Sequence, residues 1–309
     1  MIFWRKIFDR NPLFITFCDK LAAKVFIKTR IPEAEIPETL WIGKDFASIP
    51  RQLRCMDVVL KANHGSGFNH FGVLDEAGSG ELQAMTRKWL RTNYSRDKGE
   101  WAYSRVPRTL FLESRLPNTE PEKLVDVSVR CSNGKAILAS ADEDNKTPVN
   151  RSGFFGVDGK RCTHFETMDP EDIKLPEDYC LPASFSKAVE YAKRLSVGVD
   201  YARYDFLCLG TKIYPGEITV YPFAGLTPSY DTIIDTFLTD NWDVSTSWFL
   251  RQSWRGWRKA YACALRDHFA TLGRLAKYCE GLQHTEPATP DLAAGMQWPP
   301  GARPRRKET

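Results

Sequence analysis

The sequence predicts an α+β fold in which antiparallel hairpins and helices occupy separate stretches of the chain. Two hairpin patterns support this, one in residues 123–141 around Asn133-Gly134 and one in residues 201–221 around Gly210. Outside them, apolar residues recur at helical spacing in residues 11–28, 81–94 and 184–195. The chain has 309 residues, 42% of them hydrophobic and 12% aromatic, which is enough to bury extensive cores.

The N-terminal part is predicted to supply one helix and two buried strands. Pro12 suits the first turn of a helix that continues to Lys28. Three prolines then break the chain into short connections around residues 40–42. Residues 56–61 form a strand that runs into a glycine-rich loop, and residues 107–113 form a second apolar strand that ends in an acid.

The later part is predicted to contain loops, a capped helix and an extension. Residues 142–179 are polar and surround a short strand near Phe154, and Ser184 suits the cap of the next helix. Residues 248–278 have a helical pattern rich in tryptophan and arginine. The expected segments are a helical N-terminal segment, two α+β subdomains, a helical extension and a disordered polar tail, at residues 1–54, 55–117, 118–235, 236–283 and 284–309.

Composition excludes several classes of function. A net charge of +4 is too small to indicate nucleic acid as the main partner. The eight cysteines form no CxxC pair, so neither a zinc site nor a disulfide framework is expected, and a reducing cytoplasm fits best. No stretch resembles a signal peptide or a membrane span. For the helix in residues 248–278, packing of its tryptophans is favoured over contact with a membrane surface or an assembly partner.

The hairpin in residues 201–221 contains the strongest candidate site. If its turn uses three residues, Asp205 pairs with Glu217 and Arg203 pairs with Thr219, all on one face. Two opposed carboxylates repel unless a cation lies between them, and Mg2+ prefers such oxygen ligands. A two-residue turn would instead put Glu217 on the other face. An equally weighted alternative is that both carboxylates are ordinary strand-end residues paired with Arg203 or a lysine.

A second candidate site lies upstream, where Lys61 is followed by a loop of small residues. Gly65, Ser66 and Gly67 leave the backbone free to approach a phosphate, and the lysine can neutralise it. Pro215, in the acidic hairpin, lacks an N–H and therefore indicates an edge strand or a bulge.

Taken in order, these motifs resemble the TupA-like (teichuronopeptide-biosynthesis) ATP-grasp family over about residues 10–230. The matching segments are Asp9-Arg10-Asn11-Pro12, Asp19-Lys20, residues 59–67, Gly99-Glu100-Trp101-Ala102-Tyr103, Leu112-Glu113-Ser114-Arg115-Leu116, Cys131-Ser132-Asn133-Gly134, Arg203-Tyr204-Asp205 and residues 214–219. The resemblance implies an ATP-grasp fold, with two α+β subdomains holding ATP between antiparallel sheets.

The resemblance also implies roles for individual residues. Lys61 would contact the phosphates of ATP beneath the loop Gly65-Ser66-Gly67. A hinge formed by Glu113, Ser114, Arg115 and Leu116 would meet the adenine. Mg2+ would be held by Asp205, Glu217 and Thr219, and Arg203 would stabilise charge at the reacting carboxyl. The implied reaction joins a carboxylate to an amine through an acyl phosphate, in cell-surface polysaccharide or glycopeptide assembly.

The chain departs from the family pattern at two places. A lysine common in the strand before Cys131 is replaced at Ser128, and an arginine common after the next strand is absent from Asp142-Glu143-Asp144. Arg130 or Lys146 could substitute. Two alternatives therefore stay open: a catalytically weak nucleotide- or glycan-binding partner, and a glycosyltransferase that uses an acidic metal site. The sequence indicates no oligomeric state.

Overall fold

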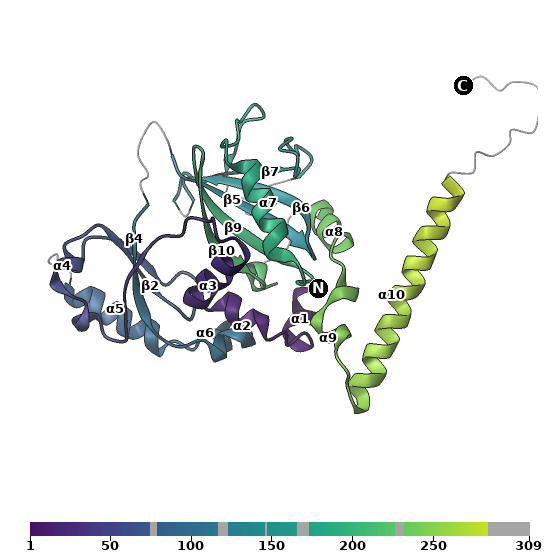
Figure 1. The fold of residues 1–309 in the computed structure, drawn as a ribbon, viewed down its shortest axis with the longest axis horizontal. Helices are drawn as coiled ribbons and strands as arrows, with labels where there is room; N and C mark the ends of the chain where they lie inside the picture. Colours follow the sequence, from purple (N-terminus) through teal and green to yellow (C-terminus); the bar gives the residue numbers. More distant parts are fainter. Residues whose placement is uncertain (75–78, 117–122, 146, 166–172, 226–231, 284–309) are drawn as a thin grey trace, which may run out of the picture. The chain divides into compact units, whose positions relative to one another are not determined.

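The computed structural model describes residues 1–74, 79–116, 123–145, 147–165, 173–225 and 232–283. These belong to two compact units, residues 1–262 and residues 263–309. The predicted disordered tail, residues 284–309, lies outside the described residues. The first unit contains two β-sheets, and every candidate site residue belongs to it (Figure 1). None of the described helices is both long enough and apolar enough to cross a bilayer.

The smaller sheet has four antiparallel strands. In spatial order these are β1 (Thr39–Gly43), β4 (Leu110–Ser114), β2 (Val58–Ala62) and β3 (Asn69–Gly72). The two central strands are buried on both faces, as their continuous apolar sequences require. Helix α5 (Ser79–Arg91) packs on this sheet, and its Trp89 joins Leu60 and Leu112 in one core (Figure 1).

The larger sheet has six strands, all antiparallel except the last pair. Its order is β10 (Lys212–Thr219), β9 (Ala202–Leu209), β5 (Val125–Ser132), β6 (Lys135–Glu143), β7 (Arg151–Phe155) and β8 (Ile173–Lys174). Helix α7 (Phe185–Ser196) lies across it and buries an apolar face against β5, β6 and β9 (Figure 1). The predicted turn at Asn133-Gly134 is confirmed, with both residues at positive φ.

The single helix predicted for residues 11–28 is wrong, because the chain forms two helices there. They are α2 (Leu13–Cys18) and α3 (Lys20–Arg30). Asp19 lies between them in an extended conformation, and its carboxylate accepts the N–H groups of Leu21 and Ala22. The N-cap residue Asp19 interrupts the helix, but the apolar residues on either side of it keep helical spacing. The periodicity of apolar residues alone therefore does not reveal where one helix ends and the next begins.

The first helix, α1 (Ile2–Ile7), attaches to the larger sheet through a fully buried arginine. Arg5 donates to the carbonyls of Tyr201 and Val220, at 2.8 and 2.9 Å, and pairs with Asp200 at 2.7 Å. Because Tyr201 precedes β9 and Val220 follows β10, this one side chain joins the open ends of the acidic hairpin. The N-terminal segment therefore helps to hold the hairpin that contains the candidate metal ligands.

The continuous helix predicted for residues 248–278 is also wrong. Helix α9 ends at Arg251, and α10 begins at Gly256, whose φ is +59°. Between them, the indole of Trp254 donates to the carbonyl of Phe249 at 2.7 Å. Helix α10 (Gly256–Gln283) is the longest described helix. The remaining elements are the short helices α4 (Arg51–Arg54), α6 (Tyr94–Lys98), α8 (Thr232–Asp240) and α9 (Trp248–Arg251), and the 3-10 turns η1 (Phe46–Ser48), η2 (Trp101–Arg105), η3 (Pro222–Gly225) and η4 (Val244–Thr246).

Candidate functional site

The turn of the acidic hairpin has two residues, so the predicted three-residue turn is wrong. Leu209 pairs with Lys212, which leaves Gly210 and Thr211 in the turn. Gly210 has a φ of +56°, a conformation that glycine adopts without a steric penalty. By itself, this turn would place Glu217 and Asp205 on opposite faces of the sheet.

A β-bulge later in β10 compensates for the shorter turn. Pro215 pairs with Phe206 and Ile218 pairs with Tyr204, so Gly216 and Glu217 together lie opposite Asp205. The extra residue restores the predicted pairing of Thr219 with Arg203. The bulge follows a proline on an edge strand, where a missing N–H costs no ladder hydrogen bond. A β-carbon at Gly216 would lie 3.1 Å from the carbonyl oxygen of Asp205, which favours glycine there.

Asp205 lies at the centre of a dense polar cluster. Arg203 binds it through two nitrogens, with Nε 2.7 Å from Oδ1 and Nη2 2.9 Å from Oδ2. The hydroxyl of Ser128 donates to Oδ1 at 2.7 Å and that of Thr219 donates to Oδ2 at 3.2 Å. These four donors use the four acceptor positions of a carboxylate. Ser128, the predicted departure from the family pattern, therefore belongs to this cluster.

Opposing effects set the charge of this cluster. Burial acts to raise the pKa of Asp205, but the charge and hydrogen bonds of Arg203 outweigh it, so that the pKa lies below its ordinary value. Burial acts to lower the pKa of Arg203, and Asp205 outweighs that effect and raises it. Both groups are consequently ionised at neutral pH. Arg130 lies beside Arg203 in the neighbouring strand, buried on the same face.

Glu217 differs from Asp205 in its contacts with the described residues. Its side chain is exposed and makes no hydrogen bond or ion pair with any described residue. Among the residues that the structure describes, no three acidic, histidine or cysteine side chains come close enough to bind a metal together. A metal here would have two carboxylates at most, as predicted, with the remaining positions left for hydroxyl, water or phosphate oxygens.

In the smaller sheet, Lys61 contacts Glu113 rather than lying free. Its Nζ is 2.5 Å from one carboxylate oxygen of Glu113, and Nζ of Lys24, on α3, is 2.8 Å from the other. Burial acts to raise the pKa of Glu113, but the two lysines outweigh it, and the pKa falls below its ordinary value. Sequence analysis missed Lys24. Its spacing of four residues from Lys20 on one helix was the available signal.

The glycine-rich loop joins β2 to β3 and is attached to the start of α3. The side chain of Lys20 donates to the carbonyl of Gly65, and the amide of Asn63 donates to Asp19 at 3.0 Å. A β-carbon at Gly65 would come within 2.6 Å of the ring of Phe68, so any larger residue at this position must displace that ring. Ser66 and Gly67 are exposed at the tip of the loop.

The predicted hinge is partly inside a strand. Glu113 and Ser114 belong to β4, and the N–H of Ser114 donates to the carbonyl of Glu38 at 3.0 Å. Arg115 is exposed and pairs with Asp57 at 2.8 Å. The backbone groups of Glu113 and Ser114 are taken up by hydrogen bonds to neighbouring segments. Of the predicted hinge residues, only Arg115 and Leu116 therefore keep a backbone that could contact a base.

Two cavities adjoin along one wall formed by Cys18, Tyr103, Glu217, Ile218 and Thr219. The smaller, of about 80 Å3, is also lined by Lys20, Lys24, Lys61 and Glu113. The larger, of about 450 Å3, is also lined by Ser66, Tyr94, Lys98, Glu100, Arg203 and Phe223. Candidate residues from both sheets therefore line one continuous region, and the larger volume is within the range of small-molecule sites.

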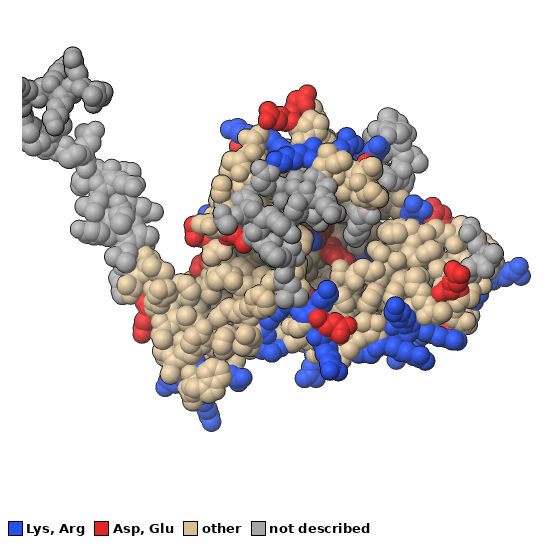
Figure 2. Space-filling model, turned by 180° about the vertical axis from the view of Figure 1, so that it is seen from behind, with Lys and Arg blue, Asp and Glu red and all other residues tan. Residues whose placement is uncertain are grey.

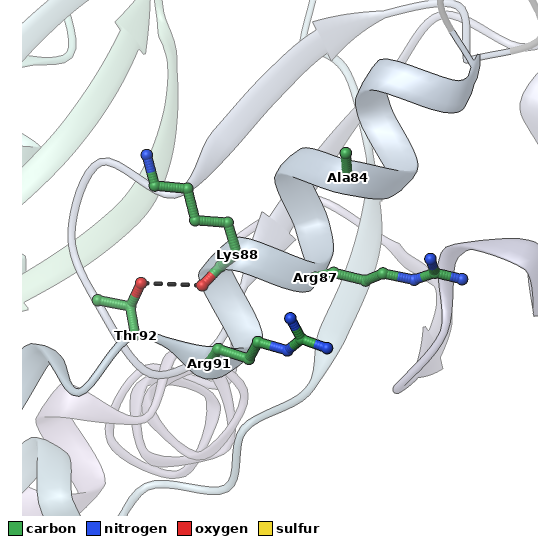
Figure 3. Close-up of a pocket in the computed structure, with 5 residues that line it drawn as sticks. All are labelled: Ala84, Arg87, Lys88, Arg91 and Thr92. Carbon is green, nitrogen blue, oxygen red and sulfur yellow. Dashed lines mark hydrogen bonds between the residues drawn. The ribbon is translucent and has the colours of Figure 1, made fainter.

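A separate hollow lies on helix α5. Arg87, Lys88 and Arg91 line it, together with Ala84 and Thr92, whose hydroxyl donates to the carbonyl of Lys88 at 2.9 Å (Figure 3). Lys and Arg side chains also gather along the lower edge of the face seen in Figure 2, so positive charge is local despite the small net charge. This hollow contains none of the predicted site residues.

The family assignment follows from a direct match. The family model described as TupA-like ATP-grasp matches residues 1–242 of this chain. The chain belongs to the TupA-like ATP-grasp family. The family and the ATP-grasp fold expected from the ordered motifs are thus confirmed. No curated protein matches the chain.

Several solved structures are similar to the chain at low identity. D-alanine–D-alanine ligase from Bacillus anthracis, complexed with ATP, is 15% identical, with 66% of this chain and 53% of that chain covered and a TM-score of 0.35. The ADP complex of N5-carboxyaminoimidazole ribonucleotide synthetase is 14% identical, with 67% and 45% covered and a TM-score of 0.41. The ATP-grasp ligase PsnB, complexed with a minimal precursor, Mg and ADP, is 13% identical, with 72% and 58% covered and a TM-score of 0.34. This chain thus spans about half the length of the first of these ligases.

Proposed function

We propose that this protein is an ATP-dependent ligase that joins a carboxylate to an amine through an acyl phosphate. The main support is that residues from both sheets line the two adjoining cavities: Lys61 and Ser66 from the β2 side, and Arg203, Glu217 and Thr219 from the acidic hairpin. Family membership supports the same reaction class. Cell-surface polysaccharide or glycopeptide assembly, with a sugar acid or amino acid as substrate, is the setting proposed from the family.

The charges in the site suit this reaction. A carboxylate that attacks the terminal phosphate of ATP brings two anions together, and cationic groups must offset their repulsion. Lys20, Lys24 and Lys61 line the smaller cavity, and Arg203 lines the larger one. Glu113 forms ion pairs with two of these lysines, Lys24 and Lys61. We propose that the phosphates of ATP take over part of that role.

The residues present fit Mg2+ in kind, because every donor is an oxygen. Glu217 has a carboxylate with no other partner, whereas Asp205 already accepts four hydrogen bonds. The longest of these comes from Thr219, at 3.2 Å. Rotation of that hydroxyl would free one acceptor position on Asp205 and turn a lone pair of Thr219 toward an ion. Bound Mg2+ would supply positive charge against the triphosphate.

The smaller cavity is too small to hold the phosphates of ATP as it stands. A cavity of about 80 Å3 is smaller than the few hundred Å3 of ordinary ligand sites, so the phosphate side must widen when ATP binds. The Lys61–Glu113 and Lys24–Glu113 ion pairs cross this side of the site. We expect them to lengthen in the nucleotide complex.

Titration calorimetry with Mg-ATP, followed by a screen of amino acids and sugar acids for ATP-dependent phosphate release, tests the proposal. Glu217→Gln is expected to weaken Mg-ATP binding at least tenfold with no loss of stability, because its carboxylate is exposed and unpaired. Glu35→Gln, at an exposed carboxylate outside both cavities, is the matched control. Unchanged binding by the Glu217 variant, or no binding by the wild type, would refute the proposal.

The saturated state of Asp205 supports a second candidate, a protein that binds nucleotide with little turnover. Ser128, which stands where the resemblance predicts a lysine, donates its hydroxyl to Asp205 and adds no positive charge. The two candidates differ in one measurement. Phosphate release that requires both a carboxylate and an amine supports the ligase, whereas Mg-ATP binding without such release supports the binding protein.

A further inference from the structure

Glu100 is a buried carboxylate in the wall of the larger cavity. It follows Gly99, whose left-handed conformation (φ +64°) ends α6 and turns the chain back into the protein. The residue is only 4% exposed, and it belongs to the lining of the cavity. Glu100 is neither one of the proposed metal ligands nor in contact with the three lysines that line the smaller cavity.

The carboxylate of Glu100 has no direct partner among the described residues. No hydrogen bond or ion pair reaches it, although a carboxylate removed from water ordinarily has one or the other. The nearby ammonium of Lys6, on α1, donates instead to the carbonyls of Lys98 and Ala224. Burial raises the pKa of Glu100 to about 7, against the opposing charges of Lys6 and Lys98. A buried, unpaired acid that opens into a cavity indicates a cationic ligand.

The other walls of the cavity suit the same ligand. Tyr94 and Tyr103 pack edge to face, with ring centroids 4.8 Å apart, and both line the cavity. Aromatic faces attract an ammonium group. Glu217 adds a second carboxylate with no hydrogen bond or ion pair to a described residue. Of the two cations in the lining, Arg203 is already bound to Asp205, and Lys98 is exposed to solvent. An anionic ligand would therefore meet two unpaired acids here.

We infer that the larger cavity binds a primary amine as its ammonium ion, with Glu100 as the carboxylate that pairs with it. The wall shared by the two cavities contains Glu217 and Thr219. An amine held by Glu100 would therefore share its cavity with Glu217 and Thr219, at the place proposed for phosphoryl transfer. That this amine is the second substrate of the ligase rests on the proposed function, but its binding by Glu100 does not.

Saturation-transfer NMR and calorimetry without nucleotide test the amine site at pH 8. The probes are the standard amino acids, glucosamine and galactosamine, each compared with its N-acetyl derivative. At least one free amine is expected to bind the wild type, and its N-acetyl derivative to bind at least tenfold more weakly. Glu100→Gln should weaken amine binding at least tenfold, and Asp97→Asn, which removes an exposed carboxylate three residues away, should not.

Glu100→Gln replaces an unpartnered buried carboxylate by a neutral group of the same shape, so it is expected to fold. Glu100→Asp, which keeps the charge on a shorter side chain, is expected to bind the amine with intermediate affinity. The inference is overturned if no probe binds the wild type, if N-acetyl derivatives bind equally well, or if the folded variants at position 100 keep wild-type affinity.

The outcomes separate this site from the proposed function. Glu100→Gln is expected to bind Mg-ATP as the wild type does, and Glu217→Gln to lose Mg-ATP affinity. A protein that binds amines through Glu100 but not Mg-ATP would retain the amine site and refute the ligase. A protein that binds Mg-ATP through Glu217 but binds amines independently of Glu100 would retain the proposed function and refute the amine site at Glu100.

Discussion

Asp9→Asn is expected to remove a large part of the pH dependence of stability. Burial, and then the negative charge of Asp200, raise the pKa of the Asp9 carboxyl to about 7, against the opposing charges of Arg5 and Arg251. In the unfolded chain its pKa returns to about 3.9. The folded state therefore binds this proton more tightly, so its contribution to stability is complete below about pH 4 and is lost as the pH rises through 7.

The magnitude follows from the two pKa values. Between pH 5 and pH 8, the titration of Asp9 lowers the free energy of unfolding by about 3 kcal/mol. The amide of the variant keeps the acceptor for the N–H of Phe249, which lies 2.8 Å from Oδ1. Its NH2 group replaces Oδ2, an atom without a partner in the described structure. The variant should therefore fold and gain stability relative to the wild type as the pH rises.

Urea unfolding at pH 5, 6, 7 and 8 measures this difference. Glu100 also has a pKa of about 7, so each protein on its own retains a slope, and the informative quantity is the difference between the wild type and Asp9→Asn. The difference should grow by about 3 kcal/mol across the range. If the difference in free energy of unfolding between the two proteins were the same at all four pH values, a raised pKa at Asp9 would be refuted.

Three other predictions concern the candidate site. Glu113→Gln leaves two lysines without their carboxylate and should lower the free energy of unfolding by about 2 kcal/mol in urea, and a change under about 0.5 kcal/mol would contradict the ion pairs. Gly65→Ala places a methyl group against the ring of Phe68 and should cost about 1–3 kcal/mol, seen as a lower Tm, whereas an unchanged Tm would contradict that contact. Amine binding at Glu100 should weaken about tenfold from pH 8 to pH 6 as the carboxylate is protonated, and equal titration isotherms at the two pH values would contradict a pKa near 7.

In the acidic hairpin, Thr219 pairs with Arg203 as predicted, but the local structure that produces this pairing differs from the predicted one. The sequence predicted one face for Arg203, Asp205, Glu217 and Thr219, using a three-residue turn. The turn has two residues, and a bulge at Gly216 and Glu217 supplies the missing residue. Pro215 signalled an irregularity near that position, but its kind and place depend on how the edge strand packs against α2 and α3.

The predicted hinge contains a residue whose contacts the sequence does not reveal. Glu113 was predicted through its place at the end of an apolar strand, and its position in β4 agrees with that. Its ion pairs with Lys24 and Lys61 join a helix and a strand that are distant in sequence. No local pattern records which charged side chains will meet when these elements pack.

The sequence by itself determined the strands of both central hairpins, the glycine-rich loop and the order of motifs that places the chain in its family. These depend on short-range factors, namely side-chain alternation, turn residues and the conformational freedom of glycine. Tertiary structure alone decided that Asp205 is saturated with donors, that three lysines line one cavity, and that Glu100 faces another without a partner. Burial and pairing of charge depend on contacts between segments far apart in the chain, and such contacts exist only once the two sheets and the N-terminal helices have packed together.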